Sequence, residues 1–348
     1  MNSFAIDDIF KTICKEFCGP ADYRCIISNI TKNFLKLELI SKKHKQIVRT
    51  TEWTHLKIRG IINENFRFIL DNFKFRRFTL YDTINMDLFF DELKDCHTLH
   101  FCRVSVSHEN IKKLKNCYAL YFSQHDLNDD IIKGFKYCHT LDLECSPITN
   151  KGVKKLKNCY DLNLEYTDIT DKVLPKLKNC HTLKLAKNYI TDKGAKELGK
   201  CHTLNLSETD ITDKGLVKLG NCYSLDIAGC ADVTNKGMKY LKNCHTVDAS
   251  ATYITDKGAK KLRNCNTVYL AGTGITDNII EKLHKCTRVN LSLCKITYDY
   301  AAQFKNVIVD VECESSDYEN FDDDYENFDD DEYDKYADNY ETAPITAT

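Results

Sequence analysis

Hydrophobic residues recur along most of the chain with a fixed period. Ten cysteines follow one another at steps of 21 residues, except for one step of 22 between Cys222 and Cys244. The ten are Cys96, Cys117, Cys138, Cys159, Cys180, Cys201, Cys222, Cys244, Cys265 and Cys286. A period in this range is typical of a solenoid, in which each coil of the chain packs against its two neighbours. The pattern predicts an extended binding surface and argues against a pocketed enzyme.

One repeat shows which elements to expect. We number positions from the cysteine, so that +3 is the third residue after it. In the repeat that begins at Cys201, apolar residues fall at +3, +5, +10, +15 and +18, namely Leu204, Leu206, Ile211, Leu216 and Leu219. The Leu-x-Leu pair alternates like a short strand with one buried face. Thr212 and Asp213 favour the start of a helix, and +15 and +18 have helical spacing. Each coil should therefore contain a strand, a tight turn and a short helix that is stabilised by stacking.

This pattern resembles the cysteine-containing subtype of the leucine-rich repeat, with its L-x-L…ITDxGL…L…C signature. The motif ITDKG stands at residues 190–194, 211–215 and 254–258. The single insertion, AGCADVTNKG at residues 228–237, is similar to the longer form of that subtype. The resemblance implies an α/β fold, a leucine-rich-repeat solenoid with a curved parallel sheet and short convex helices.

The register extends beyond the cysteines at both ends. Phe75 and Trp53 fit the cysteine position of two degenerate coils, and Val307 fits it at the far end, where it would open a last strand. The solenoid should then span residues 54–310 in about twelve to thirteen turns. Some thirteen strands at about 4.8 Å each make a sheet of roughly 60 Å.

The eighteen cysteines could form either disulfides or free thiols. Repeat cysteines stack in one column with parallel side chains, whereas a disulfide needs side chains that face each other. We therefore expect buried free thiols in a reducing compartment, the cytoplasm, with the nucleus as a second option. Cys-His pairs such as Cys180-His181 could suggest zinc, but Tyr118, Tyr160 and Tyr223 occupy the same +1 position. A stacked aromatic and polar ladder is the expectation there, with no metal and no cofactor.

Residues 1–53 lack the repeat and carry two amphipathic segments. Ile9, Phe10 and Ile13 share a helical face, and a second apolar run follows in FLKLELISKKHKQIV at residues 34–48. The run up to Trp53 resembles the second half of an F-box, although the usual Leu-Pro opening is absent and His44 replaces a common Trp. The simpler alternative is a helical cap that seals the first coil.

An F-box before cysteine-containing leucine-rich repeats is a known pairing, and the chain is similar in this respect to proteins of giant DNA viruses that infect amoebae. For a viral protein the expected compartment would be the host cytoplasm. The resemblance implies the substrate-recognition subunit of an SCF-type cullin–RING ubiquitin ligase, with no catalytic residues of its own. A Skp-type adaptor in its cullin complex would bind the F-box, and an unknown protein substrate would bind the solenoid. The other reading is an interaction scaffold without a ligase role. The residues expected at the adaptor are Ile9, Phe10, Ile13, Leu35, Leu37, Leu39, Ile40, Ile47 and Val48.

Residues 311–348 differ in composition from the rest. They hold fifteen acidic residues and one Lys, and they repeat the sequence YENFDDD. Such composition predicts disorder. The formal net charge of −2 therefore divides into a body of about +12 and a tail of −14. The tail could serve solubility, fold back on the basic body, or mimic a nucleic acid.

The outward positions of the strands should form the concave face. At +4, these residues alternate with the buried +3 and +5 positions. Their mixed charge argues against nucleic acid as a concave ligand, and no apolar run suggests a membrane span. A protein partner is the expectation, against the simpler reading of a merely solvated face. The +4 residues are His100, Tyr121, Asp142, Asn163, Lys184, Asn205, Asp226, Asp248, Tyr269 and Asn290.

Overall fold

The protein is a solenoid with one parallel sheet. The computed structural model describes residues 52–61, 70, 74–84, 86–123, 127–297, 301–305 and 307–308. Thirteen strands follow one another in chain order, each paired in parallel with the next. They are β1 (Glu52–Ile61), β2 (Lys74–Ile84), β3 (Thr98–Cys102), β4 (Ala119–Ser123), β5 (Thr140–Asp142), β6 (Asp161–Asn163), β7 (Thr182–Lys184), β8 (Thr203–Asn205), β9 (Ser224–Asp226), β10 (Thr246–Asp248), β11 (Thr267–Tyr269), β12 (Arg288–Asn290) and β13 (Val307–Ile308).

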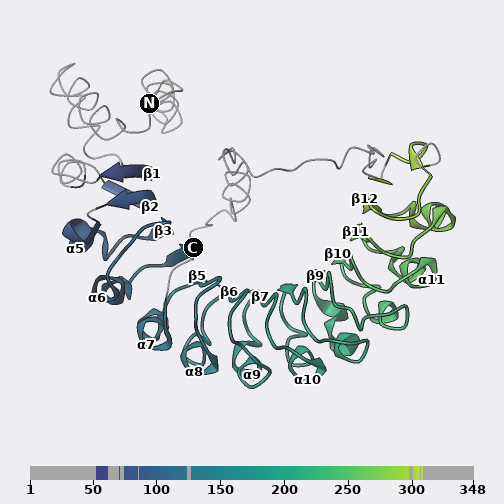
Figure 1. Cartoon of the computed structure of the whole chain (residues 1–348), viewed down its shortest axis with the longest axis horizontal. Helices are drawn as coiled ribbons and strands as arrows, with labels where there is room; N and C mark the ends of the chain where they lie inside the picture. Colours follow the sequence, from purple (N-terminus) through teal and green to yellow (C-terminus); the bar gives the residue numbers. More distant parts are fainter. Residues whose placement is uncertain are drawn as a thin grey trace, which may run out of the picture. The chain divides into compact units, whose positions relative to one another are not determined.

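Short helices cover the other side of the coils. Figure 1 shows strands along the concave side and helices along the convex side of the array. The α-helices are α5 (Phe90–Leu93), α6 (His108–Ile111), α7 (Asp129–Ile132), α8 (Asn150–Val153), α9 (Leu174–Leu177), α10 (Asp192–Ala195) and α11 (Asp256–Ala259). The 3-10 helices are η2 (Met86–Phe89), η3 (Lys112–Leu114), η4 (Lys133–Phe135), η5 (Gly215–Asn221), η6 (Met238–Tyr240), η7 (Lys260–Leu262) and η8 (Asp277–Leu283). Helices of three to seven residues are too short to be stable alone, so the coils depend on stacking.

The predicted register is confirmed at the first coils and wrong at the last. Phe78 pairs with Leu99, the residue three positions after Cys96. Phe75, three positions before Phe78, therefore stands in the register of the repeat cysteines, which we call the cysteine column. Trp53 in turn pairs with Phe75. At the far end, however, Val307 pairs with Val289, a +3 residue. Val307 is therefore not on the cysteine column. The final coil is three residues shorter than the regular period of 21, so extrapolating that period gave the wrong register for Val307.

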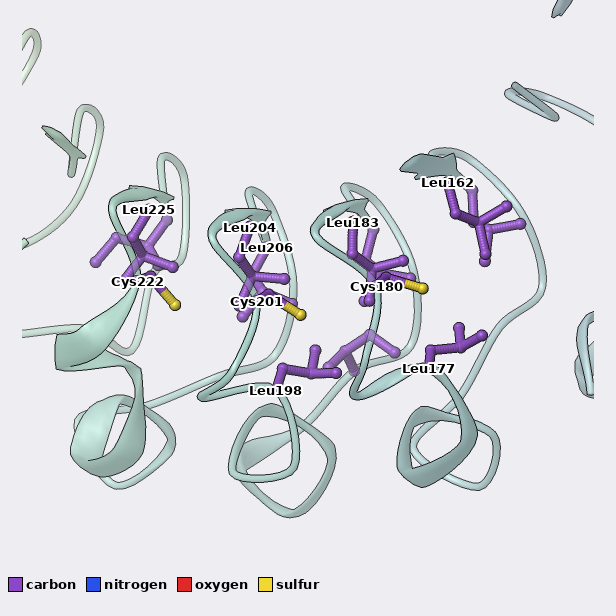
Figure 2. Close-up of a cluster of buried hydrophobic side chains, with 14 of the residues drawn as sticks. Leu162, Leu177, Cys180, Leu183, Leu198, Cys201, Leu204, Leu206, Cys222 and Leu225 are labelled. Carbon is purple, nitrogen blue, oxygen red and sulfur yellow. The ribbon is translucent and has the colours of Figure 1, made fainter. Parts of the chain in front are cut away.

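The core lies between sheet and helices and repeats from coil to coil. In Figure 2, Cys180, Cys201 and Cys222 lie beneath the strand leucines, and Leu177 and Leu198 approach from the helical side. Nine of the ten repeat cysteines are buried and Cys96 is half-buried, and the fourteen described cysteines are all free thiols. The expectation of buried free thiols is confirmed for nine of the ten repeat cysteines. Each fully buried leucine contributes about 1.5–3 kcal/mol, which explains why the apolar positions vary so little.

A ladder of threonine and aspartate joins consecutive coils at the start of the helices. In six coils the threonine of the ITD-type motif donates from its N–H and its Oγ1 to the two carboxylate oxygens of the aspartate in the preceding coil, whereas Thr170 and Thr255 bond to Asn150 and Asn235 at the same place. At Asp192 these bonds come from Thr212, at 2.7 Å from the N–H and 2.8 Å from Oγ1. The same arrangement joins Asp129 to Thr149, Asp171 to Thr191, Asp213 to Thr234, Asp256 to Thr276 and Asp277 to Thr297. The aspartate thus bridges coils, a role beyond the predicted helix start.

The glycine of the motif is required by this ladder. A Cβ built on Gly215 would lie 2.7 Å from Oδ1 of Asp192, closer than real contacts allow. Gly215 therefore makes room for the aspartate of the preceding coil.

Ten strands end in the same left-handed turn. In these coils the residue at +7 has a positive φ, and two of the ten residues, Gly229 and Gly272, are glycines. The others are Asp82, Arg103, Cys145, Tyr166, Lys187, Glu208, Ala251 and Leu293. The next position, +8, is mostly a buried polar residue; Thr209, for example, donates to the Leu206 carbonyl at 2.6 Å. The repeat therefore holds its sharp turn with a buried hydrogen bond and accepts backbone strain at most of these sites.

Candidate functional site

The ten predicted concave residues form one continuous row across β3 to β12. Their Cα atoms are direct partners from strand to strand, from His100 opposite Tyr121 to Tyr269 opposite Asn290. Nine are half-buried, and Asn163 is buried at 7% exposure. The geometry thus brings together all ten residues, side by side on one face.

Six members of this row hold the strand end as well as facing outward. The side chains of Asp142, Asn163, Asn205, Asp226, Asp248 and Asn290 each accept a hydrogen bond from the backbone N–H two residues later, at 2.8–3.1 Å. Such Asx turns stabilise a bend in the backbone. The sequence signal for this role is the choice of Asp or Asn just before the turn, and strand alternation alone does not indicate it.

The remaining four members are aromatic or cationic. His100 and Tyr121 stack with ring centroids 3.8 Å apart, and the Arg288 guanidinium lies 6.0 Å from the Tyr269 ring centroid. Lys184 lies between Asn163 and Asn205 in the middle of the row. Aromatic groups at the two ends and one cation in the centre give this face varied chemistry, which suits contact with a polypeptide.

The middle of the face is acidic. Two +6 residues, Glu144 and Glu165, add carboxyl groups to the row. Nδ2 of Asn163 donates to Oε2 of Glu144 at 3.4 Å, and Nδ2 of Asn205 donates to Oε1 of Glu165 at 2.7 Å. Burial raises the pKa of Glu165 to about 7; Lys184 opposes this rise, while the carboxylates of Glu144, Asp142 and Asp226 add to it. Burial also raises the pKa of Asp226 to about 6. These two carboxyls therefore change charge near neutral pH.

The aromatic ladder predicted beside the core is confirmed. Eight rings stack in an unbroken series with centroids 4.3–4.7 Å apart: His97, Tyr118, His139, Tyr160, His181, His202, Tyr223 and His245. Nδ1 of His139 lies 3.1 Å from Oγ1 of Thr140, and the other four histidines make the same contact with the threonine that follows them. Parallel stacked rings do not converge on a point. Among the described residues, no group of three or more His, Cys, Asp or Glu could hold a metal ion.

The repeat thiols are not activated. Burial raises the pKa of Cys180 to about 12, with Asp161 adding to the effect, and it raises that of Cys201 to about 12 as well. Cys145 is exposed, yet partial burial and then Glu144 also raise its pKa. Nucleophilic cysteines have lowered pKa values, so these three are poor candidates for catalysis.

The nine residues expected at an adaptor lie outside the described residues, as does the acidic segment from 311 onward. Those predictions remain without a structural test. No helix in the described part of the chain has the length and apolar character needed to cross a membrane.

Comparisons with known proteins agree with the repeat architecture. A family model described as "Leucine Rich repeat" matches residues 202–220. Comparison with curated protein sequences gives no match. Among solved structures, an internalin from Listeria monocytogenes is similar, with a TM-score of 0.58 and 17% identity over 82% of this chain and 93% of that chain. A structure of a TLR13–ssRNA13 complex has a TM-score of 0.50 and 15% identity over 72% of this chain and 39% of that chain. At these identities the likeness concerns the fold alone.

Proposed function

We propose that this leucine-rich-repeat protein is an interaction scaffold without catalytic activity, and that it binds a protein partner on the concave face of its sheet. The observation that carries the proposal is the +4 row, ten half-buried or buried polar and aromatic residues in one register. Six of the ten are anchored by Asx turns, so their side chains are held in place before a partner arrives. Preorganised side chains lose little conformational freedom on binding, which favours affinity.

The partner should be an extended segment that follows the row across several strands. The carboxyls of Glu165 and Asp226 and the ammonium of Lys184 lie within four neighbouring strands. A ligand there would contact acidic, amide and cationic groups in sequence, which provides specificity through charge complementarity.

Charge substitutions in the row test this proposal. Asp226→Asn and Asp248→Asn keep an oxygen for the Asx turn and remove the charge, so the fold should be preserved. Combined with Lys184→Glu, they should reduce partner affinity at least ten-fold and leave the melting temperature nearly unchanged. A matched triple variant away from the concave strands should retain affinity: Lys193→Glu in α10, with Asp210→Asn and Asp232→Asn in the segments that connect strands to helices. If the concave variant binds the partner as well as the parent does, the proposal is wrong.

A finer candidate is the substrate receptor of an SCF-type cullin–RING ligase. Its support is the F-box-like run that includes Leu39, Ile40 and Trp53, placed directly before the repeats. In this case a Skp-type adaptor would bind the N-terminal segment and the concave partner would be the ubiquitination substrate. Pull-down of the full chain with purified Skp-type adaptors tests it, with Leu39→Asp and Ile40→Asp as the disrupting variant. Failure of the parent chain to bind any adaptor leaves the scaffold function alone.

The free thiols support a reducing location for this function. The described cysteines form no disulfide, and disulfides are rare in reducing compartments. We therefore propose the cytoplasm as the site of action. Imaging of the full chain in the cell that produces it tests this location. Secretion of the protein would overturn it.

A further inference from the structure

Charge is divided unequally between the two sides of the coils. Nine convex segments of nine residues each hold 26 Lys and Arg against 10 Asp and Glu. These segments are 108–116, 129–137, 150–158, 171–179, 192–200, 213–221, 235–243, 256–264 and 277–285. The ten concave strand segments, from +2 to +6, hold two basic and six acidic residues. The basic character of the body is therefore located on the helical side, away from the face that serves the proposed function.

A single row of lysines runs through this convex surface. The lysine that follows the Asp or Asn of each motif is present in six consecutive coils, and all six side chains are exposed: Lys151, Lys172, Lys193, Lys214, Lys236 and Lys257. We call them the first-turn lysine row. None of them makes an ion pair with a described residue, in contrast to Lys112, Lys113 and Lys133 nearby.

The repeat holds the backbone of this row in a fixed position. The N–H of Lys193 donates to Oγ1 of Thr191 at 3.3 Å, and that of Lys214 donates to Oγ1 of Thr212 at 3.2 Å. Lys151 and Lys236 make the same bond. Because each threonine is itself bound to the preceding coil, the lysines recur at one place per coil. The result is an ordered line of positive charge along the array.

Solubility alone does not account for this choice of residue. Lys151, Lys193 and Lys257 are the second residues of the short helices α8, α10 and α11, and Lys172, Lys214 and Lys236 lie just before α9, η5 and η6. Glutamate would serve solubility at least as well. Lysine is nevertheless retained in six successive coils.

We propose that the convex face binds the phosphate backbone of single-stranded nucleic acid through the first-turn lysine row. A regular line of exposed ammonium groups matches a regular line of phosphates and requires no base contacts. Curvature selects the flexible form of this polyanion. The helices at whose starts the row lies, among them α8, α9, α10 and α11, are on the outer side of the curved array (Figure 1). A flat membrane meets only part of this side, and duplex DNA resists bending over lengths of about 50 nm. A single strand can follow the curve.

Salt dependence of binding by the full-length protein tests the proposal. A fluorescent oligothymidylate of about 30 nucleotides is titrated between about 20 and about 200 mM salt, where log K should fall with a slope of about −0.7 per phosphate contacted. The triple variant Lys172→Gln, Lys193→Gln and Lys214→Gln should reduce the magnitude of this slope by about 2. The control variant, Lys184→Gln, Lys187→Gln and Arg288→Gln, removes the same charge from the sheet side and should leave the slope nearly unchanged.

Two outcomes would overturn the proposal directly. In one, the protein does not bind oligothymidylate at the lowest salt. In the other, the slope of log K against log salt concentration decreases equally in the two variants. Tighter binding to phosphatidylserine vesicles than to the oligonucleotide would assign the face to a membrane. Equal binding of poly-glutamate of matched charge would assign it to acidic polypeptides. Thermal melting of each variant excludes unfolding as the cause, since surface substitutions of this kind change stability little.

Discussion

Replacing Gly215 by Ala should destabilise the protein because of Asp192 in the preceding coil. The added Cβ would lie 2.7 Å from Oδ1 of Asp192, the atom that accepts the hydrogen bond from the Thr212 N–H. The carboxylate must move, and the two bonds to Thr212 weaken. Partly buried hydrogen bonds to a charged acceptor contribute about 1–1.5 kcal/mol each. Alanine regains about 1 kcal/mol over glycine in a helix. The net loss of unfolding free energy should be about 1–2 kcal/mol.

A double-mutant cycle separates this contact from other effects. Asp192→Ala alone should cost about 2–3 kcal/mol, because both bonds are lost. In that background Gly215→Ala should become neutral or stabilising by up to about 1 kcal/mol, since the next nearest atoms are 3.4 Å from the new Cβ. The coupling energy should therefore be about 2 kcal/mol. Gly134→Ala is the matched control: its Cβ would meet nothing closer than 4.0 Å.

Urea unfolding followed by circular dichroism measures these differences, provided that the unfolding free energy falls with urea concentration at the same slope in all variants. Hydrogen exchange at the Thr212 amide provides a local measure, because this N–H should exchange faster in Asp192→Ala than in the parent. The reasoning is refuted if Gly215→Ala is harmless in the parent chain, or if its effect is the same with and without Asp192.

Three further predictions concern the core, the strand turns and the acidic face. Cys180→Ser should cost about 1–3 kcal/mol in urea unfolding, because it places a hydroxyl in an apolar stack; an unchanged midpoint would contradict a structural cysteine column. Ala251→Gly should stabilise by about 0.5 kcal/mol, because Ala251 has a φ of 51° and no large side chain to lose, and a lower midpoint would show that the left-handed turn carries no strain. The folded pKa of Glu165, about 7, lies above its ordinary value of 4.5, so the native state binds extra protons between these pH values and loses stability as pH rises through them. Near pH 8, urea titration should therefore give Glu165→Gln a free energy of unfolding about 1–2 kcal/mol above that of the parent, after allowance for solvent screening. Below about pH 4.5 the two free energies should agree.

The repeat could be predicted because its signals are periodic and local. Cysteine at one register and leucine at +3 and +5 indicate which side chains face the core, and the same offsets identified Trp53 and Phe75 despite their different chemistry. The aromatic ladder followed from noting that tyrosine replaces histidine at +1. The concave row followed from strand alternation alone.

What could not be predicted depends on contacts between coils. Thr212 and Asp213 read locally as a helix start, and only the stacked coils show that each aspartate binds the threonine that follows 20 or 21 residues later. The Asx turns of Asp226 and Asn205 were likewise assigned to partner binding alone. The position of Val307 depends on a coil that departs from the period, so extrapolation failed there.

The most direct test of the account is where a bound partner touches the coils. A photo-crosslinking amino acid placed at Asn205 on the concave face should join the partner, whereas the same group at the convex Lys218 should not. Crosslinks to one protein, identified by mass spectrometry, are expected from Asn205 and from its neighbour Lys184. Crosslinks to that protein from Lys218, with none from the concave positions, would show that the sheet is not the protein-binding surface.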